Sequence, residues 1–262
     1  SPPSECPSFS DSDAHRKTYT TLDQTASLEL ESLTVTAEWQ INDAHKATMI
    51  YGTREMDETA IQEFDAVSPN LFWTSRPQFE EQESIEFRLE SDFDRFRTTL
   101  GVFMWDSEYS LWQNTYFFGG LFASPWTKQE TENQAAFGQL DWDITDNLTL
   151  TLGGRYTKDE KDFCQVFTGA PGEGQAAAVT DYDGLAKVPL FAHGDESVCP
   201  DWSRGVINNN FFDPVTNQDA VFNGSQSWSD FTPKIGLTYN IERGILYASY
   251  TEGFRSGGYN GR

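Results

Sequence analysis

The chain of 262 residues carries 18 Lys and Arg against 41 Asp and Glu, and this net charge of −23 argues against a nucleic-acid partner. No run approaches the ~20 apolar residues that a membrane-spanning helix needs, which excludes an α-helical membrane protein. Aromatic residues make up 15% of the chain, a bias typical of the aromatic girdles of transmembrane β-barrels, although a soluble β-sandwich would also show it. The acidity favours cationic or neutral ligands, or reflects solvated loops.

Eight segments alternate apolar and polar residues with the period of two that predicts β-strands. These segments are residues 28–39, 45–56, 79–91, 96–111, 129–142, 147–163, 228–240 and 244–254. Short turns alternate with long connections along the chain, and the long ones are residues 57–78, 112–128 and 164–227. Short turns at one rim and long loops at the other indicate an antiparallel up-and-down barrel, because Greek-key sandwiches have less reason to sort their loops by length.

The two faces of each strand differ in polarity. The apolar rows, which we expect to face lipid, include Leu148, Leu150, Leu152, Ile235 and Leu237, and the opposite rows, which we expect to face the barrel lumen, include Arg155, Arg88 and Glu86. Charged residues on one face argue against a dry sandwich core, since an unpaired buried charge costs several kcal/mol. Segment 96–111 departs from the pattern: Phe103 and Trp105 fall opposite Val102 and Met104. Either these aromatic residues face the lumen or a bulge shifts the register.

The last two predicted strands carry a recognisable signature. The sequences FTPKIGL at 231–237, LYASY at 246–250 and EGFRSGGYN at 252–260 together resemble the late barrel of TonB-dependent outer-membrane receptors. Five earlier stretches are similar to the same family, at residues 38–43, 52–55, 82–89, 136–140 and 148–157. The resemblance covers residues 28 to 260 with gaps at the loops.

The resemblance implies an all-β, antiparallel transmembrane barrel in the bacterial outer membrane, in contact with lipid and coupled to the TonB complex. Family members have 22 strands around an N-terminal plug, so residues 1–262 are expected to be one partial barrel domain of about eight strands. Residues 1–27 would lead into the first strand, and residues 164–227 would form a long extracellular loop. No plug domain, TonB box or terminal aromatic strand is recognised in the sequence, so energy coupling is implied by analogy alone.

The resemblance further implies import of a scarce nutrient such as a ferric siderophore, haem, cobalamin or an oligosaccharide. Three alternatives remain at this point: a passive outer-membrane porin, a soluble aromatic-rich β module that binds carbohydrate, and a complete eight-strand barrel. No catalytic constellation is recognised, because the three His residues lie in unrelated segments and no G-x-S-x-G elbow is present. We therefore expect neither enzymatic activity nor a cofactor or metal; acidic residues 181–183 and 195–196 lack most positions of a calcium loop.

Aromatic residues on the long connections are the predicted ligand-binding residues. These are Trp73, Trp112, Tyr116, Phe117 and Phe118. Exposed rings at an extracellular mouth stack on sugars, porphyrins or catecholates at little ordering cost. The alternative is that the same rings pack the loops together or form the outer girdle.

Three cysteines, Cys6, Cys164 and Cys199, lie in or beside predicted loops. In an oxidising compartment, Cys164 and Cys199 are predicted to close the longest loop with a disulfide, which leaves Cys6 to pair with a residue outside this chain. The alternative is three free thiols. No close Cys or His spacing indicates a zinc site.

Overall fold

A computed structural model describes residues 22–65, 71–118, 120–123, 125–167 and 220–259, and they form a single antiparallel sheet. The strands are β1 (Thr25–Asn42), β2 (His45–Glu63), β3 (Phe72–Asp92), β4 (Phe96–Trp112), β5 (Asn114–Phe117), β6 (Gly120–Ala123), β7 (Trp126–Thr145), β8 (Leu148–Phe167), β9 (Ala220–Ile241) and β10 (Gly244–Thr251). The described part of the chain contains no helix long and apolar enough to cross a membrane.

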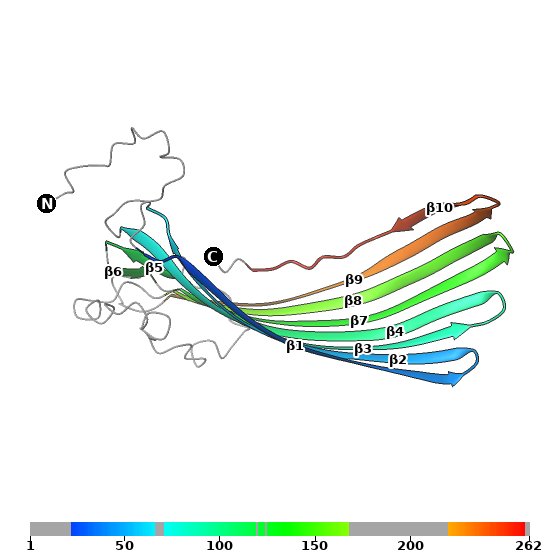
Figure 1. Cartoon of the computed structure of the whole chain (residues 1–262), viewed down its shortest axis with the longest axis horizontal. Coiled ribbons are helices and arrows are strands. Elements are labelled where there is room, and N and C mark those ends of the chain that lie inside the picture. The colour runs from blue at the N-terminus through cyan, green and yellow to red at the C-terminus, as the bar shows by residue number, and fades with distance from the viewer. Residues whose placement is uncertain (1–21, 66–70, 119, 124, 168–219, 260–262) are drawn as a thin grey trace, which may run out of the picture.

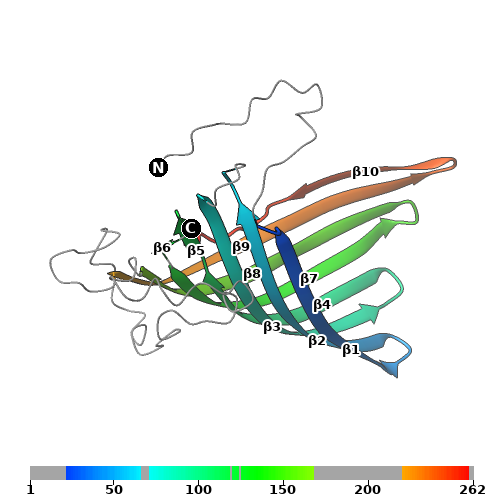
Figure 2. The same cartoon turned by 60° about the vertical axis from the view of Figure 1, so that its left-hand side comes forward.

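The strands follow one another around a curved, open wall. Their order is β1-β2-β3-β4-β7-β8-β9-β10, and β5 pairs with β3 and β6. Figure 1 shows the tight turns gathered at one end of the sheet and β5 and β6 at the other. The turned view in Figure 2 shows the same wall from the side, with β1 and β10 at its two edges. An up-and-down wall that does not close on itself confirms the prediction of a partial barrel.

All eight predicted strands are present, and most of them are longer than predicted at the end away from the tight turns. The predicted loop 57–78 is largely strand, because β2 continues to Glu63 and β3 begins at Phe72. The predicted loop 112–128 is also mostly strand: β5 and β6 are the tip of the long hairpin that β4 and β7 form. The prediction of long loops at these two places was therefore wrong.

The register explains why the second hairpin looks like a loop in the sequence. Leu111 pairs with Gln78, and Asn114 pairs with Ser75, so β5 keeps the register of β4 against β3. Between them the N–H of Gln113 donates to the carbonyl oxygen of Pro125 at 3.0 Å. Proline has no N–H to give to the ladder, which interrupts the hairpin at this point without ending it.

Cross-strand partners share a face of the sheet, so the register tests the predicted lipid and lumenal rows. Leu150 pairs with Leu237 on β9 and Trp142 on β7, which continues one apolar row. Arg155 pairs with Phe137, Phe137 with Gly101 and Gly101 with Arg88. Leu150 and Arg88 therefore lie on opposite faces, as the barrel prediction requires. We call the face of Leu150 the outer face and that of Arg88 the lumenal face.

The outer face carries an exposed apolar band across the strands. Its large hydrophobic members include Leu33, Val35, Ile85, Phe87, Leu100, Val102, Leu152, Ile235 and Leu237, all of them exposed. Such a continuous apolar surface is unfavourable in water and suits contact with lipid tails. No register shift occurs along β4, so Phe103 and Trp105 lie on the lumenal face and the alternative of a bulge is excluded.

Candidate ligand-binding end of the sheet

The turn between β5 and β6 presents one aromatic side chain to solvent. Phe117 pairs with Gly120, which leaves two residues in the turn. The first of them, Phe118, has a φ of 50° and its side chain is 82% exposed. A positive φ suits two-residue hairpin turns but is unusual for a bulky aromatic residue. The N–H of Phe118 donates to the carbonyl oxygen of Leu71 at 2.9 Å, which ties the turn to β3.

Three phenylalanines form a ladder on the lumenal face at this end. The ring centroids of Phe64 and Phe72 lie 5.2 Å apart, and those of Phe72 and Phe117 lie 4.6 Å apart with nearly parallel planes. Asp65 holds the start of β3, because its Oδ2 accepts hydrogen bonds from the backbone N–H groups of Leu71 and Phe72 at 2.8 and 2.6 Å. The ladder gives Phe117 a fixed position beside the exposed Phe118.

The outer face at the same end is closed by a stacked pair. The rings of Trp73 and Tyr116 lie 3.7 Å apart with planes within 3° of each other. Both side chains are buried, at 4% and 1% exposure. Each ring covers one face of the other, and the near-complete burial of both side chains leaves no ring face available to stack on a ligand in this arrangement. Trp112 is only half-buried, and its ring lies 5.9 Å from that of Trp126 with the planes tilted by 36°.

Several polar atoms around this stacked pair have no hydrogen-bond partner. They are Trp73 Nε1, Ser75 Oγ, Tyr116 Oη and Trp126 Nε1. All four side chains are buried and lie on the outer face by strand register. Burial raises the pKa of Tyr116 to about 12, so its hydroxyl remains protonated. A buried donor without a partner costs free energy, and such atoms are often found where a ligand or a rearrangement later satisfies them.

The five predicted ligand-binding residues therefore lie at one end of the sheet but in different environments. Phe118 is exposed and Phe117 partly so, whereas Trp73 and Tyr116 pack on each other. Phe64, which extends the lumenal ladder, was not among the predicted ligand-binding residues. Its signal lay in the aromatic residues Phe64 and Phe72 on either side of residues 65–71, and it was hidden because residues 57–78 were predicted to be a loop.

Two neighbouring rows of carboxylates lie on the outer face, between the apolar band and the aromatic end. The first row consists of Glu31, Glu55, Glu81, Glu108, Glu130 and Asp162, each the cross-strand partner of the next. The second consists of Glu83, Asp106, Glu132 and Glu160. Lys128 relieves the repulsion locally, with its Nζ 3.1 Å from both Glu108 and Glu130.

Seven of these carboxylates line an open pocket of about 410 Å³. Arg54 is its single basic lining residue. The described residues contain no group of three or more His, Cys, Asp or Glu side chains arranged to hold a metal ion. The acidic residues 181–183 and 195–196, weighed above as a calcium loop, lie outside the described part of the chain. The pocket is strongly electronegative and disfavours an anionic ligand.

Cys164 is fully buried and disulfide-bonded. It lies at the end of β8 away from the tight turns, which we call the outward end of the sheet. Cys199 and Cys6 both lie outside the described residues, so the pairing of Cys164 with Cys199 stays a prediction. A disulfide at this position fixes the end of β8 to a segment that is distant in sequence.

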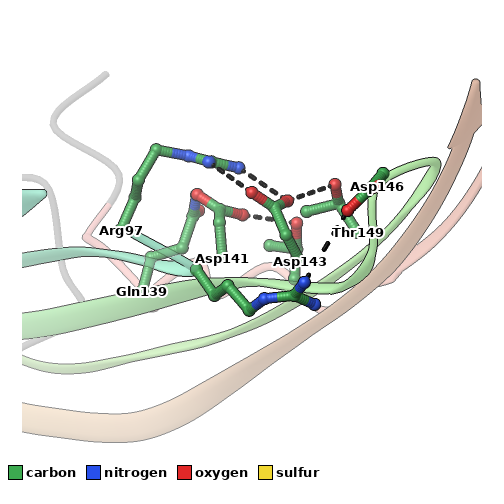
Figure 3. A network of polar contacts seen from close by, with 8 residues as sticks. Arg97, Gln139, Asp141, Asp143, Asp146 and Thr149 are labelled. Atoms are coloured by element: carbon green, nitrogen blue, oxygen red, sulfur yellow. Dashed lines mark hydrogen bonds and ion pairs between the residues drawn. The ribbon is translucent and has the colours of Figure 1, made fainter. Parts of the chain in front are cut away.

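At the opposite end of the sheet, near the tight turns, the lumenal face carries a polar network (Figure 3). The guanidinium of Arg97 makes two hydrogen bonds to the carboxylate of Asp143, at 2.7 and 3.1 Å. Thr149 donates to the same carboxylate at 2.6 Å, and Asp141 accepts from Thr151 at 2.5 Å and from Gln139 at 2.9 Å. Charges here are paired within the sheet, so this region supports the wall and leaves little for a ligand.

The family described as "TonB dependent receptor-like, beta-barrel" matches residues 4–262. Similar solved structures include the ferric yersiniabactin uptake receptor FyuA from Yersinia pestis, at 12% identity and a TM-score of 0.62. They also include the siderophore receptor PiuA from Acinetobacter baumannii, at 13% and 0.54, and the ferric-catecholate import receptor Fiu from E. coli K12, at 14% and 0.53. None of the curated proteins matches the chain.

The chain spans about a third of these solved receptors. The match with FyuA covers 86% of this chain and 28% of that one, the match with PiuA covers 87% and 32%, and the match with Fiu covers 89% and 36%. At these identities the likeness shows a shared fold alone.

Proposed function

The chain belongs to the TonB-dependent receptor-like β-barrel family, and from this membership we propose that it forms part of a receptor that imports a scarce nutrient with energy supplied through TonB. Proteins of this family are outer-membrane transporters and not enzymes. The observation that carries the proposal is the family match over residues 4–262. The apolar outer face and polar lumenal face support it, because a wall of this kind separates lipid from an aqueous interior.

We further propose a ferric siderophore as the ligand. Two of the similar structures support this class, because they are receptors for uptake of ferric yersiniabactin and for import of ferric catecholates. The aromatic rings at the outward end suit a ligand with flat apolar or aromatic parts. Haem, cobalamin and oligosaccharides share that property and belong in the same test.

Within the site, we assign the first contact to Phe117 and Phe118, and a further contact on the outer face to Trp112. Phe118 stands exposed at the tip of the β5–β6 hairpin, where a ligand arriving from outside would meet it. Trp73 and Tyr116 would contribute through their edges, because the indole N–H and the phenol hydroxyl have no partner while the ring faces cover each other. The negative rows on the outer face would keep anionic groups away from the lipid side.

The test uses the full-length receptor in cells that lack their own siderophore receptors. Uptake of ferric yersiniabactin, ferric citrate, a ferric catecholate, haem, cobalamin and an oligosaccharide is measured for the wild type and for Phe118→Ala. Phe118→Ala should reduce uptake of one of these ligands at least ~10-fold, while heat-modifiable migration shows unchanged barrel assembly. Phe93→Ala is the matched control, since Phe93 is also exposed but lies in the tight turn after β3, at the other rim.

Unchanged uptake in Phe117→Ala and Phe118→Ala, with a loss on neutralising Asp181 and Asp183, would replace the aromatic site with an electrostatic one. A wild type that imports all of these ligands equally well without TonB would instead contradict the transport proposal itself, because passive diffusion needs no coupling.

A further inference from the structure

Two aromatic rings lie close to Arg155 on the lumenal face. Phe103 on β4 and Phe137 on β7 both point to this face by register, at the level of the apolar band outside. The ring of Phe137 lies directly over Gly101, where any Cβ would collide with it. Phe137 is therefore held flat against the wall, and the close approach requires glycine at position 101.

These two rings hold a guanidinium between them. Cζ of Arg155 lies 5.5 Å from the centroid of Phe103 and 5.7 Å from that of Phe137. Its Nε donates to Thr157 Oγ1 at 3.1 Å. Cation–π contacts and one hydrogen bond fix the orientation of the side chain and leave its terminal nitrogens free to bind a further group.

Among the described residues, Arg155 has no acidic partner, whereas several other basic residues of this sheet pair with a carboxylate. The cations within 4 Å of a carboxylate include Lys46, Arg88, Arg95, Arg97, Lys128 and Lys158. Throughout the part of the chain that the structure describes, no carboxylate lies this close to Arg155 or Lys234. Acidic residues outnumber basic ones by more than two to one, so an unpaired arginine here is not explained by a shortage of carboxylates.

A second cation lies beside Arg155 on the same face. Lys234 on β9 pairs with Gly153, two residues before Arg155 on β8. Its Nζ donates to the neutral Oε1 of Gln139 at 2.9 Å. Two acidic residues of this face are engaged elsewhere: Asp141 accepts from Thr151 and Gln139, and Asp230 accepts from a backbone N–H. Two neighbouring positive charges without a counter-ion favour an anion between them.

We propose that Arg155 and Lys234, walled by Phe103 and Phe137, form a carboxylate-binding site on the inner wall of the barrel. The arginine fork binds both carboxylate oxygens, the lysine adds a point charge, and the rings receive an apolar group attached to the carboxylate. The carboxylate belongs either to a small molecule inside the barrel or to a protein segment that occupies the lumen. This site is separate from the loop aromatics, and its test does not depend on transport.

The experiment uses the full-length receptor in detergent. It measures the binding of small aromatic probes and the protection of backbone amides from hydrogen exchange. The probes are benzoate and benzamide, which have the same ring but differ in charge. If the source is a small molecule, benzoate binds, benzamide does not, and Arg155→Gln weakens benzoate binding ~10- to 100-fold. If the source is a protein segment, benzoate binds neither to the wild type nor to the Arg155→Gln variant. Arg155→Gln then accelerates amide hydrogen exchange in a segment outside this sheet at least ~10-fold.

Arg243→Gln is the matched control, because Arg243 is an exposed arginine in the turn between β9 and β10. Arg155→Lys is the second variant if Arg155→Gln fails to assemble. It keeps the charge but loses the fork, so it should give an effect in the same direction and smaller. Equal binding of both probes overturns the proposal. So does an Arg155 variant that matches Arg243→Gln in both binding and hydrogen exchange.

Discussion

The apolar band and the outward end of the same strands follow different rules. In the band, Leu150 and its cross-strand neighbours face one way and charged or polar residues the other. At the outward end both faces are buried, as Trp73 and Thr74 show on successive positions of β3. A lipid bilayer imposes the period of two, because one face must be apolar. Beyond the bilayer that constraint ends, and the strands use both faces for packing and for charge.

The largest expected effect concerns the outward end. A Cys164–Cys199 disulfide would stabilise the folded state by ~4 kcal/mol in the chain-entropy model, because it closes a long loop in the unfolded chain. Replacing either cysteine with serine should lower the thermal midpoint by a similar amount in both variants, whereas Cys6→Ser should leave it unchanged. Peptide mapping under non-reducing conditions identifies the partner directly. A linked Cys6–Cys164 peptide would mean that the N-terminal segment, and not the long loop, is fixed to β8.

In the apolar band, a new charge should lower the stability of the barrel on the outer face alone. Leu150→Arg is expected to cost ~2–4 kcal/mol if the residue lies near the bilayer midplane. Thr238→Arg is the control, since Thr238 lies on β9 and faces the lumen, where water solvates the guanidinium. Unfolding in lipid vesicles gives both values. Equal losses in the two variants would contradict the assignment of the faces.

The sequence allowed the band to be predicted almost residue by residue and the outward end only in outline. Leu148, Leu150 and Leu152 alternate with polar residues, and this pattern has one structural solution in a membrane wall. Phe64, Phe72 and Phe117 do not alternate cleanly with polar residues, since aromatic side chains occupy both faces there. The unpaired state of Arg155 could not be foreseen either, because it depends on which side chains four strands bring together.

The stacked pair offers a smaller effect of opposite sign. Tyr116→Phe keeps the stack on Trp73 and removes a buried hydroxyl without a partner, so it should stabilise the protein by ~1 kcal/mol. Burial raises the pKa of Tyr116 to about 12, so the unfolded chain releases the phenol proton at a lower pH than the folded protein does. The stability of the wild type should therefore be constant below pH 10 and fall as the pH rises through 12. Tyr109→Phe is the control and should destabilise, because the hydroxyl of Tyr109 donates to Gln78 at 3.3 Å. Stabilities are compared by denaturant unfolding.

The smallest effect is expected in the carboxylate rows, which separate the two regions. Glu81 lies between Glu55 and Glu108 as cross-strand neighbours, and like charges directly opposite each other are destabilising. Glu81→Gln should therefore stabilise the sheet by ~0.2–1 kcal/mol at low salt, with the gain shrinking as salt screens the charges. Glu90→Gln is the matched control and should not stabilise, because Glu90 already pairs with Lys46 at 2.8 Å. A loss of stability in Glu81→Gln would mean that these carboxylates act together, as they do when each is held by a cation, and the outward end would then be organised by ions as well as by aromatic packing.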